Sequence, residues 1–159
     1  MEIEINRDEL VKSMNLLQGI VERRNTMPIL SHVLLHAENS TLSLSATDLD
    51  VGMTISCMSK TVKKGDAAVQ GRKLYEIVKE LSEGASVRMK MEENFWMEIH
   101  SQKSRFKLSG LDPKDFPTLP KFEEMKYESM DGQKLHEMIE KTVYAVSQDE
   151  SRKNLSGVY

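Results

Sequence analysis

Two histidines and two aspartates have spacings that suggest metal chemistry. His32 and His36 are four residues apart, a spacing that lets two imidazoles bind one ion when both lie on a helix. Residues 29–36 instead have the apolar composition of a strand, in which four residues span roughly 13 Å. The two rings would then be too far apart to share an ion, and we expect both to be structural. For Asp48 and Asp50 we expect a turn between strands rather than a pair of metal ligands.

The sequence shows no clear catalytic nucleophile and no phosphate-binding loop. Cys57 is the single cysteine, has no clear histidine partner and lies in a strand-like run, so we expect a small buried residue. Gly65 and Gly71 do not form a phosphate-binding loop, and the sequence has no Walker, dinucleotide-binding or nucleophile-elbow motif. These absences favour a non-catalytic protein without a cofactor or a metal. A small metalloenzyme that uses Asp48, Asp50 and a histidine stays open as an alternative.

The composition is that of a globular protein. The chain has 159 residues, of which 39% are hydrophobic and 30% charged, enough for one domain with a core of its own. One cysteine allows no internal disulfide, so a reducing cytoplasm is expected. The first residues alternate without a basic leader or a long apolar run, which predicts neither a signal peptide nor a membrane span. A net charge of −3 argues against a domain that grips nucleic acid by overall charge, so the distribution of charge must decide.

Hydrophobic periodicity predicts an α+β fold. Residues 1–5 alternate like a strand, and Asn6 has the features of a helix N-cap, with Glu9 three positions later. Apolar residues at helical spacing predict helices over 7–22 and 72–81. Short connections, with a turn at Asn39-Ser40, predict a mostly antiparallel sheet. Strand-like runs occur at 29–37, 41–46, 50–58, 67–70, 86–92, 95–100 and 104–109.

A proline-rich segment predicts a domain boundary. Residues 110–121 hold three of the four prolines, which divides the chain into 1–121 and 122–159. A strand over 124–130 and a third helix from Leu135 to Val146 then repeat the opening pattern.

A shift of 125 residues places Asn6 on Asp131, and the segment that begins at Leu30 on the segment that begins at Leu155. We interpret the end of the chain as the strand, helix and start of the next strand of a second copy. That segment is too short for a core of its own, so we expect it to pack elsewhere or to be poorly ordered.

Basic residues collect on the predicted helices. Each helix also carries acidic residues, so one interpretation is ordinary solvated faces with charge pairs. The other is that the helices line one surface and offer cations to phosphates, which positions DNA without reading its sequence. The basic residues concerned are Lys12, Arg23, Arg24, Arg72, Lys73, Lys79, Lys134, Lys141, Arg152 and Lys153.

Several motifs in order carry a family resemblance. They are the segments 24–30 (RNTMPIL), 42–50 (LSLSATDLD) and 104–111 (SRFKLSGL), the loop Asp115-Phe116-Pro117, and the segment from Gln148 to Arg152. With these the chain resembles the bacterial DNA polymerase III β subunits, the sliding clamps, over their first domain and the opening of their second.

The resemblance implies a DNA-clamp fold of repeated domains, each with two helices packed on curved sheets. It implies a head-to-tail homodimer that closes a ring around double-stranded DNA, without sequence preference, and tethers the polymerase. The protein would then be a processivity factor and not an enzyme. The family's other partners are the catalytic subunit of DNA polymerase III and the clamp loader. Without the family's third domain we expect no ring closure.

The resemblance also assigns residues. Arg24 corresponds to a family position that contacts DNA. Arg72, Lys73 and Lys79, on the second inward helix, and Lys153 are expected to contact phosphates. Two positions that are aromatic in some relatives are Lys153 and Asn154 here, which puts base stacking in doubt. The ring interface corresponds to Lys73, Ile77, Arg105, Phe106 and Leu108, although alternate residues of such an edge strand would enter the core in any case. Part of the pocket for partner peptides corresponds to Arg152 and Leu155. A stand-alone α+β protein-interaction module without a DNA role is the alternative function.

Overall fold

The computed structural model describes residues 1–21, 27–119, 126–147 and 149–158. Contacts within the chain divide it into two compact units, Met1–Leu119 and Pro120–Tyr159.

The first unit is an antiparallel sheet with two helices, which confirms the predicted α+β class. The helices are α1 (Arg7–Leu17) and α2 (Gly71–Glu80), with short 3-10 turns at Pro28–Ser31 and Pro113–Asp115. All strand pairs are antiparallel, and the nine-stranded sheet has the order β4-β3-β2-β6-β9-β8-β7-β1-β5. The strands are β1 (Glu2–Asn6), β2 (His32–Glu38), β3 (Thr41–Thr47), β4 (Gly52–Met58), β5 (Lys60–Lys63), β6 (Gly65–Gln70), β7 (Ser86–Met91), β8 (Trp96–Ser101) and β9 (Ser104–Leu111).

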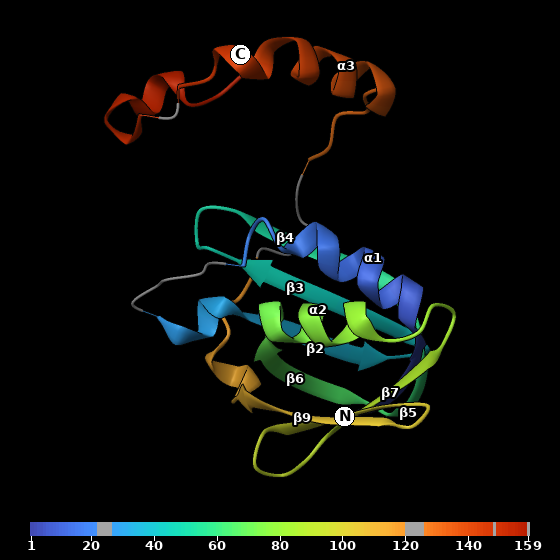
Figure 1. Ribbon diagram of the computed structural model, residues 1–159. Helices are drawn as coiled ribbons and strands as arrows, with labels where there is room; N and C mark the ends of the chain where they lie inside the picture. Colours follow the sequence, from blue (N-terminus) through green and yellow to red (C-terminus); the bar gives the residue numbers. More distant parts are fainter. Residues whose placement is uncertain (22–26, 120–125, 148, 159) are drawn as a thin grey trace. The chain divides into compact units, whose positions relative to one another are not determined.

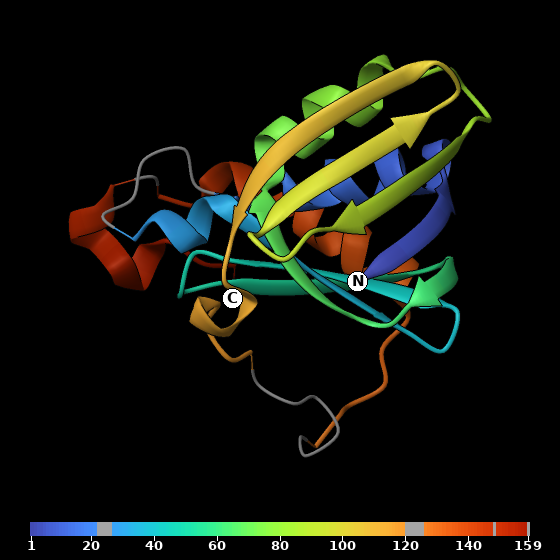
Figure 2. The ribbon, with the colours of Figure 1, turned by 90° about the horizontal axis from the view of Figure 1, so that it is seen from below.

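Two corners fold this sheet around the core. At the first, β4 and β5 are separated only by Ser59, yet they lie at opposite ends of the strand order. At the second, β9 pairs with β8 over Ser104–Ser109 and then with β6 through Gly110 and Leu111. Strands β7–β9 consequently cross the direction of β2–β4 at an angle (Figure 2). The sheet therefore folds into two layers, and the main hydrophobic core lies between them.

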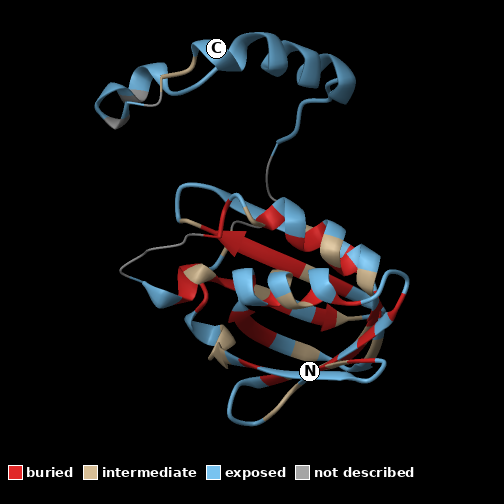
Figure 3. Cartoon of the chain, in the orientation of Figure 1, coloured by how far each residue is buried: buried red, intermediate tan, exposed pale blue. Residues whose placement is uncertain are grey.

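Both helices lie on the same side of this core, next to each other (Figure 1). Helical spacing puts Leu10, Met14 and Leu17 of α1 on one face, and all three are fully buried. Leu74 and Val78 of α2 are buried in the same cluster of side chains. Figure 3 shows these buried stripes against the buried strands below them. Each such side chain stabilises the fold by about 1.5–3 kcal/mol, so packing fixes which helix faces remain free for function.

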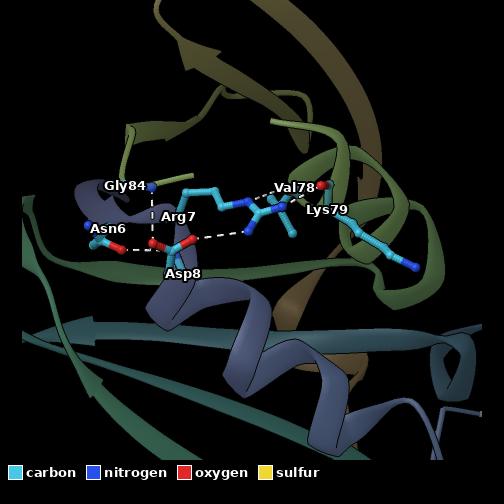
Figure 4. A network of polar contacts seen from close by, with 6 residues as sticks. All are labelled: Asn6, Arg7, Asp8, Val78, Lys79 and Gly84. Carbon is cyan, nitrogen blue, oxygen red and sulfur yellow. Dashed lines mark hydrogen bonds and ion pairs between the residues drawn. The ribbon is translucent and has the colours of Figure 1, made fainter. Parts of the chain in front are cut away.

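A polar network joins the start of α1 to the end of α2 (Figure 4). The Arg7 guanidinium donates from Nε to the carbonyl of Val78, at 3.1 Å, and from Nη2 to the carbonyl of Lys79. Asp8 pairs with Arg7 at 3.0 Å and accepts a hydrogen bond from Gly84 N at 3.0 Å. These bonds satisfy the carbonyl of Lys79 near the end of α2 and add to the hydrogen bond that the carbonyl of Val78 accepts from Leu81 N, at 3.3 Å. They hold the start of α1 next to the end of α2.

Local signals in the sequence predicted several features correctly. The Asn6 side chain caps α1 by accepting from Asp8 N at 2.8 Å. Asn39 and Ser40 have φ of 48° and 63°, the backbone conformation that a two-residue hairpin turn requires. Cys57 is buried, as predicted, and donates to the carbonyl of Leu42 at 3.5 Å. Burial raises the pKa of its thiol.

The elements differ from the prediction most clearly in three places. Helix α1 ends at Leu17 instead of residue 22, although Ile20 and Val21 remain buried beyond it. Strand β2 begins at His32 instead of residue 29, because Pro28 starts a 3-10 turn. Strand β5 was not predicted, because most of its residues are exposed and show no apolar alternation. It forms a strand because it pairs with β1, a contact that its own sequence does not indicate.

The second unit contains helix α3 (Gly132–Thr142), followed by 3-10 turns at Val143–Ala145 and Glu150–Leu155. Asp131 caps α3, as predicted, by accepting from Gln133 N and Lys134 N. Residues 126–130 form no strand, in contrast to the strand predicted over 124–130, and 155–158 do not start one. A strand needs a hydrogen-bonded neighbour, and the described part of this unit offers none. Helix α3 has no buried residue.

Candidate nucleic-acid interface

The solvent face of α2 carries three cations and two carboxylates. Arg72 Nε lies 3.1 Å from Glu76 Oε1, and Lys73 Nζ lies 3.3 Å from Glu76 Oε2. Helical geometry explains both pairs, since positions three and four apart lie on the same side of a helix. The hydrogen bonds from Arg72 and Lys73 lower the pKa of the Glu76 carboxyl. Helix α2 therefore has one excess positive charge, and two of its three cations are already paired with Glu76.

Lys79 is placed differently from the other two cations. Its ammonium lies 6.0 Å from the centroid of the Tyr75 ring, and it has no carboxylate partner among the described residues. Tyr75 in turn donates its hydroxyl proton to Asn15 Oδ1 of α1, at 3.0 Å. An ammonium above an aromatic face keeps its full charge. Lys79 is thus the cation of α2 most available to an incoming anion.

A groove of about 360 Å³ runs between the end of α1 and the start of α2. Its wall includes Asn15 and Gln18 from α1, with Gln70, Arg72 and Tyr75 from the other side. Amide, hydroxyl and guanidinium groups of this kind donate hydrogen bonds to phosphate oxygens without distinguishing bases. The groove can hold part of a nucleic-acid backbone.

The outer face of the sheet also carries ion pairs. Arg88 pairs with Glu2, and Lys60 with Glu4 at 3.2 Å. Lys107 lies 3.0 Å from Glu98, and this contact lowers the pKa of Glu98 while it raises the pKa of Lys107. Exposed pairs of this kind add little stability.

The predicted DNA contacts are only partly described. Arg72, Lys73 and Lys79 are all exposed on α2. Arg24 and the side chain of Lys153 lie outside the described residues.

The predicted ring-interface residues lie on an open strand edge and on α2. From Ser104 to Ser109, β9 pairs on one side with β8, and no other described strand pairs with its second side. Phe106 is 36% exposed on this edge and Arg105 is exposed, whereas Leu108 is buried in the core. On α2, Lys73 is exposed and Ile77 is half-buried against the core. Leu108 therefore fills the core, as an inward position of an ordinary edge strand would.

The predicted peptide-pocket residues are both exposed in the second unit. Arg152 Nε lies 3.5 Å from Asp149 Oδ2, and Leu155 has an exposed fraction of 52%. Hydrogen bonds from Ser151 lower the pKa of Asp149. Both side chains are thus open to solvent.

The candidate metal ligands have other partners. His32 Nδ1 lies 2.9 Å from the carbonyl of Pro28, and His36 Nδ1 lies 2.6 Å from Asp66 Oδ1. Both histidines belong to β2, as predicted. Asp48 accepts hydrogen bonds from the backbone of Asp50 and Val51, so the segment is the predicted turn. Across the residues that the structure describes, no three potential metal ligands lie together.

Replacing His32 with asparagine is expected to reduce the dependence of stability on pH. Burial lowers the pKa of His32 below its usual 6.5, so the folded chain binds this proton less tightly than the unfolded chain. The free energy of unfolding should fall as the pH decreases through 6.5 towards the lowered pKa. Asparagine can keep the hydrogen bond to Pro28 but does not titrate. Urea unfolding at about pH 7.5 and about pH 5.5 tests this; an equal pH dependence in both proteins would refute it, since His36 is common to both.

The charge pairs expected on the helix faces occur on α2, where Glu76 pairs with both Arg72 and Lys73, as their spacing allows. The contacts of Arg7 are not among the sequence predictions. A cation in the first turn of a helix opposes the helix dipole, and this unfavourable position was the available signal that Arg7 has a partner elsewhere.

No helix in the described ranges is long and apolar enough to cross a membrane.

The similarity to known proteins extends along the whole chain. Residues 1–120 match the family described as DNA polymerase III beta subunit, N-terminal domain. A beta sliding clamp of Caulobacter vibrioides is 37% identical over 160 residues, which covers 100% of this chain, and one of Pseudomonas putida is 35% identical over 159 residues, which covers 99%. The chain spans 43% of the length of each.

Solved structures agree with this match. The Caulobacter crescentus pol III beta structure has a TM-score of 0.92 at 37% identity, over 100% of this chain and 43% of that one. The DNA polymerase III subunit beta from Pseudomonas aeruginosa has a TM-score of 0.90 at 35% identity, over 99% of this chain and 43% of that one. The chain therefore belongs to the DNA polymerase III beta subunit family, the beta sliding clamps.

Proposed function

We propose that this chain forms part of a ring that encircles duplex DNA and tethers the replicative polymerase. The observation that carries the proposal is the pair of helices packed on one side of the core, with Arg72, Lys73 and Lys79 on the solvent face of α2. A ring built from such units would point these helices at the DNA and its sheets at the solvent. Retention on DNA would then come from topology rather than from tight contacts.

Weak and mixed charge is consistent with this role. Phosphate contacts from exposed lysine and arginine position a duplex without reading bases. Since α2 has only one excess positive charge, the contacts can form and break as the ring moves. Such a protein is a non-catalytic processivity factor, because encirclement requires no chemical step.

Assembly and partners follow from the same proposal. The open edge of β9 with Phe106 and Arg105, together with Lys73 and Ile77, would form one side of a head-to-tail homodimer interface. Arg152 and Leu155 would contribute to a pocket for peptides of the polymerase III catalytic subunit and the clamp loader. Residues 1–121 would be the first clamp domain and 122–159 the opening of the second. We place the protein in the cytoplasm, where replication proteins of bacteria work.

The stand-alone interaction module is not favoured, because the similarity to clamps covers essentially the whole chain.

Duplex binding by the chain tests the proposal. Fluorescence anisotropy with two labelled duplexes of unrelated sequence should give equal affinities, which fall as a power of the salt concentration. Lys79→Gln should lower the slope of log K against log salt by about 0.9, the loss of one phosphate contact. Lys90→Gln on the outer face of the sheet is the matched control and should leave the slope unchanged. Absence of binding at low salt, or a strong preference for one sequence, would contradict the proposal.

A further inference from the structure

The carboxylate of Glu76 forms ion pairs with the two cations that a phosphate would otherwise contact, Arg72 and Lys73. Arg72 contacts one of its oxygens at 3.1 Å and Lys73 the other at 3.3 Å. All three side chains are about half exposed, so the pairs lie on the helix surface and not in the core. An anion that approaches α2 therefore meets a cluster with one net positive charge instead of two.

The surroundings make this competition direct. Arg72 and Glu76 both line the groove between α1 and α2, together with Gln18, Gln70 and Tyr75. A phosphate in this groove would have to draw Arg72 away from Glu76. The freed carboxylate would then lie close to the phosphate and repel it. The groove thus contains both the donor for a phosphate and its intramolecular competitor.

We propose that Glu76 is a positioning residue that limits the affinity of this chain for duplex DNA by competing with phosphate for Arg72 and Lys73. The inference rests on the proposed DNA-binding function and concerns its regulation. A clamp must bind DNA weakly enough to move along it. The carboxylate that Arg72 and Lys73 share would keep the affinity of α2 for DNA low. Lys79, which has no carboxylate partner among the described residues, supplies the contact that remains.

Glu76→Gln, compared with Glu80→Gln, tests this. Both changes remove one negative charge from the exposed face of α2, but Glu80 pairs with neither Arg72 nor Lys73. Glu76→Gln should steepen the slope of log K against log salt by about 0.9 and tighten binding at low salt by roughly fivefold or more. Glu80→Gln should tighten binding by less than about twofold, the effect of charge alone.

A double-mutant cycle with Arg72→Gln supplies a readout that a purely structural role would not change. In the wild-type background Arg72→Gln should weaken binding little, because Glu76 already compensates Arg72. In the Glu76→Gln background the same change should weaken binding several-fold. Glu76→Asp, which keeps the carboxylate, should restore a slope close to that of the wild type.

The outcomes separate the inference from the proposed function. Duplex binding by the wild type with equal effects of Glu76→Gln and Glu80→Gln would overturn the competition and leave the DNA-binding role intact. No duplex binding by the wild type and by Glu76→Gln at low salt would overturn both. A larger gain and a steeper slope for Glu76→Gln alone would support the inference.

Discussion

Gly110→Ala is expected to destabilise the first unit by about 3 kcal/mol, through overpacking at the sheet corner. A Cβ atom at this position would lie 2.3 Å from the carbonyl oxygen of Ala68 and 2.9 Å from that of Phe95. Both obstacles are backbone atoms, which cannot rotate away like the end of a side chain. The strand would have to withdraw from β6, which breaks the pairing of Ala68 with Leu111.

Fluorescence-detected urea unfolding measures this effect in the first unit, because Trp96 is the single tryptophan and belongs to β8. Gly19→Ala is the matched control, since a Cβ there meets nothing within 4 Å. That change should be neutral or stabilising by up to about 1 kcal/mol. If Gly110→Ala proved as stable as Gly19→Ala, the close approach of β9 to β6 at this corner would be wrong.

Arg7→Met is expected to cost about 2 kcal/mol of unfolding free energy, the order of magnitude of hydrogen bonds that a charged group donates. The Arg7 side chain is only 13% exposed, and methionine keeps most of its length while it removes the donors. The carbonyls of Val78 and Lys79 would lose the guanidinium donors, and the carbonyl of Val78 would keep only its 3.3 Å hydrogen bond from Leu81 N. The end of α2, with Lys79, would then be less well ordered.

Lys12→Met controls for the loss of a cation from α1, because Lys12 is exposed and has no ion pair within the described residues. It should change the free energy of unfolding by less than about 0.5 kcal/mol. Amide hydrogen exchange at the end of α2 should rise in Arg7→Met and not in the control. Equal stabilities and equal exchange would show that the network in Figure 4 does not join the helices.

The features that sequence reasoning predicted correctly are those with local causes. Asn6 and Asp131 cap their helices through bonds to residues two or three positions away, which any reading of the adjacent sequence can anticipate. The Asn39-Ser40 turn follows in the same way from the left-handed backbone that asparagine tolerates. The regular burial of Leu10, Met14 and Leu17 follows from helical period alone.

The features that it missed depend on contacts between distant segments. Strand β5 is ordered by β1, more than fifty residues earlier, and its own residues show no strand pattern. Arg7 reaches carbonyls 71 and 72 residues away, a contact that only the packed helices create. The cations of α2 were predicted as a DNA-binding site, whereas the role proposed for Glu76 depends on its distances from Arg72 and Lys73.

The measurement that tests the central proposal most directly is lysine acetylation footprinting with and without a duplex, read by mass spectrometry. The proposal predicts that DNA protects Lys73 and Lys79 on α2, and that it leaves Lys90 and Lys107 on the outer face of the sheet as reactive as before. Protection should disappear at high salt, because the contacts are with phosphates. Protection of Lys90 and Lys107 instead, or the same reactivity at all four lysines with and without the duplex, would contradict the assignment of the helices as the DNA-facing surface.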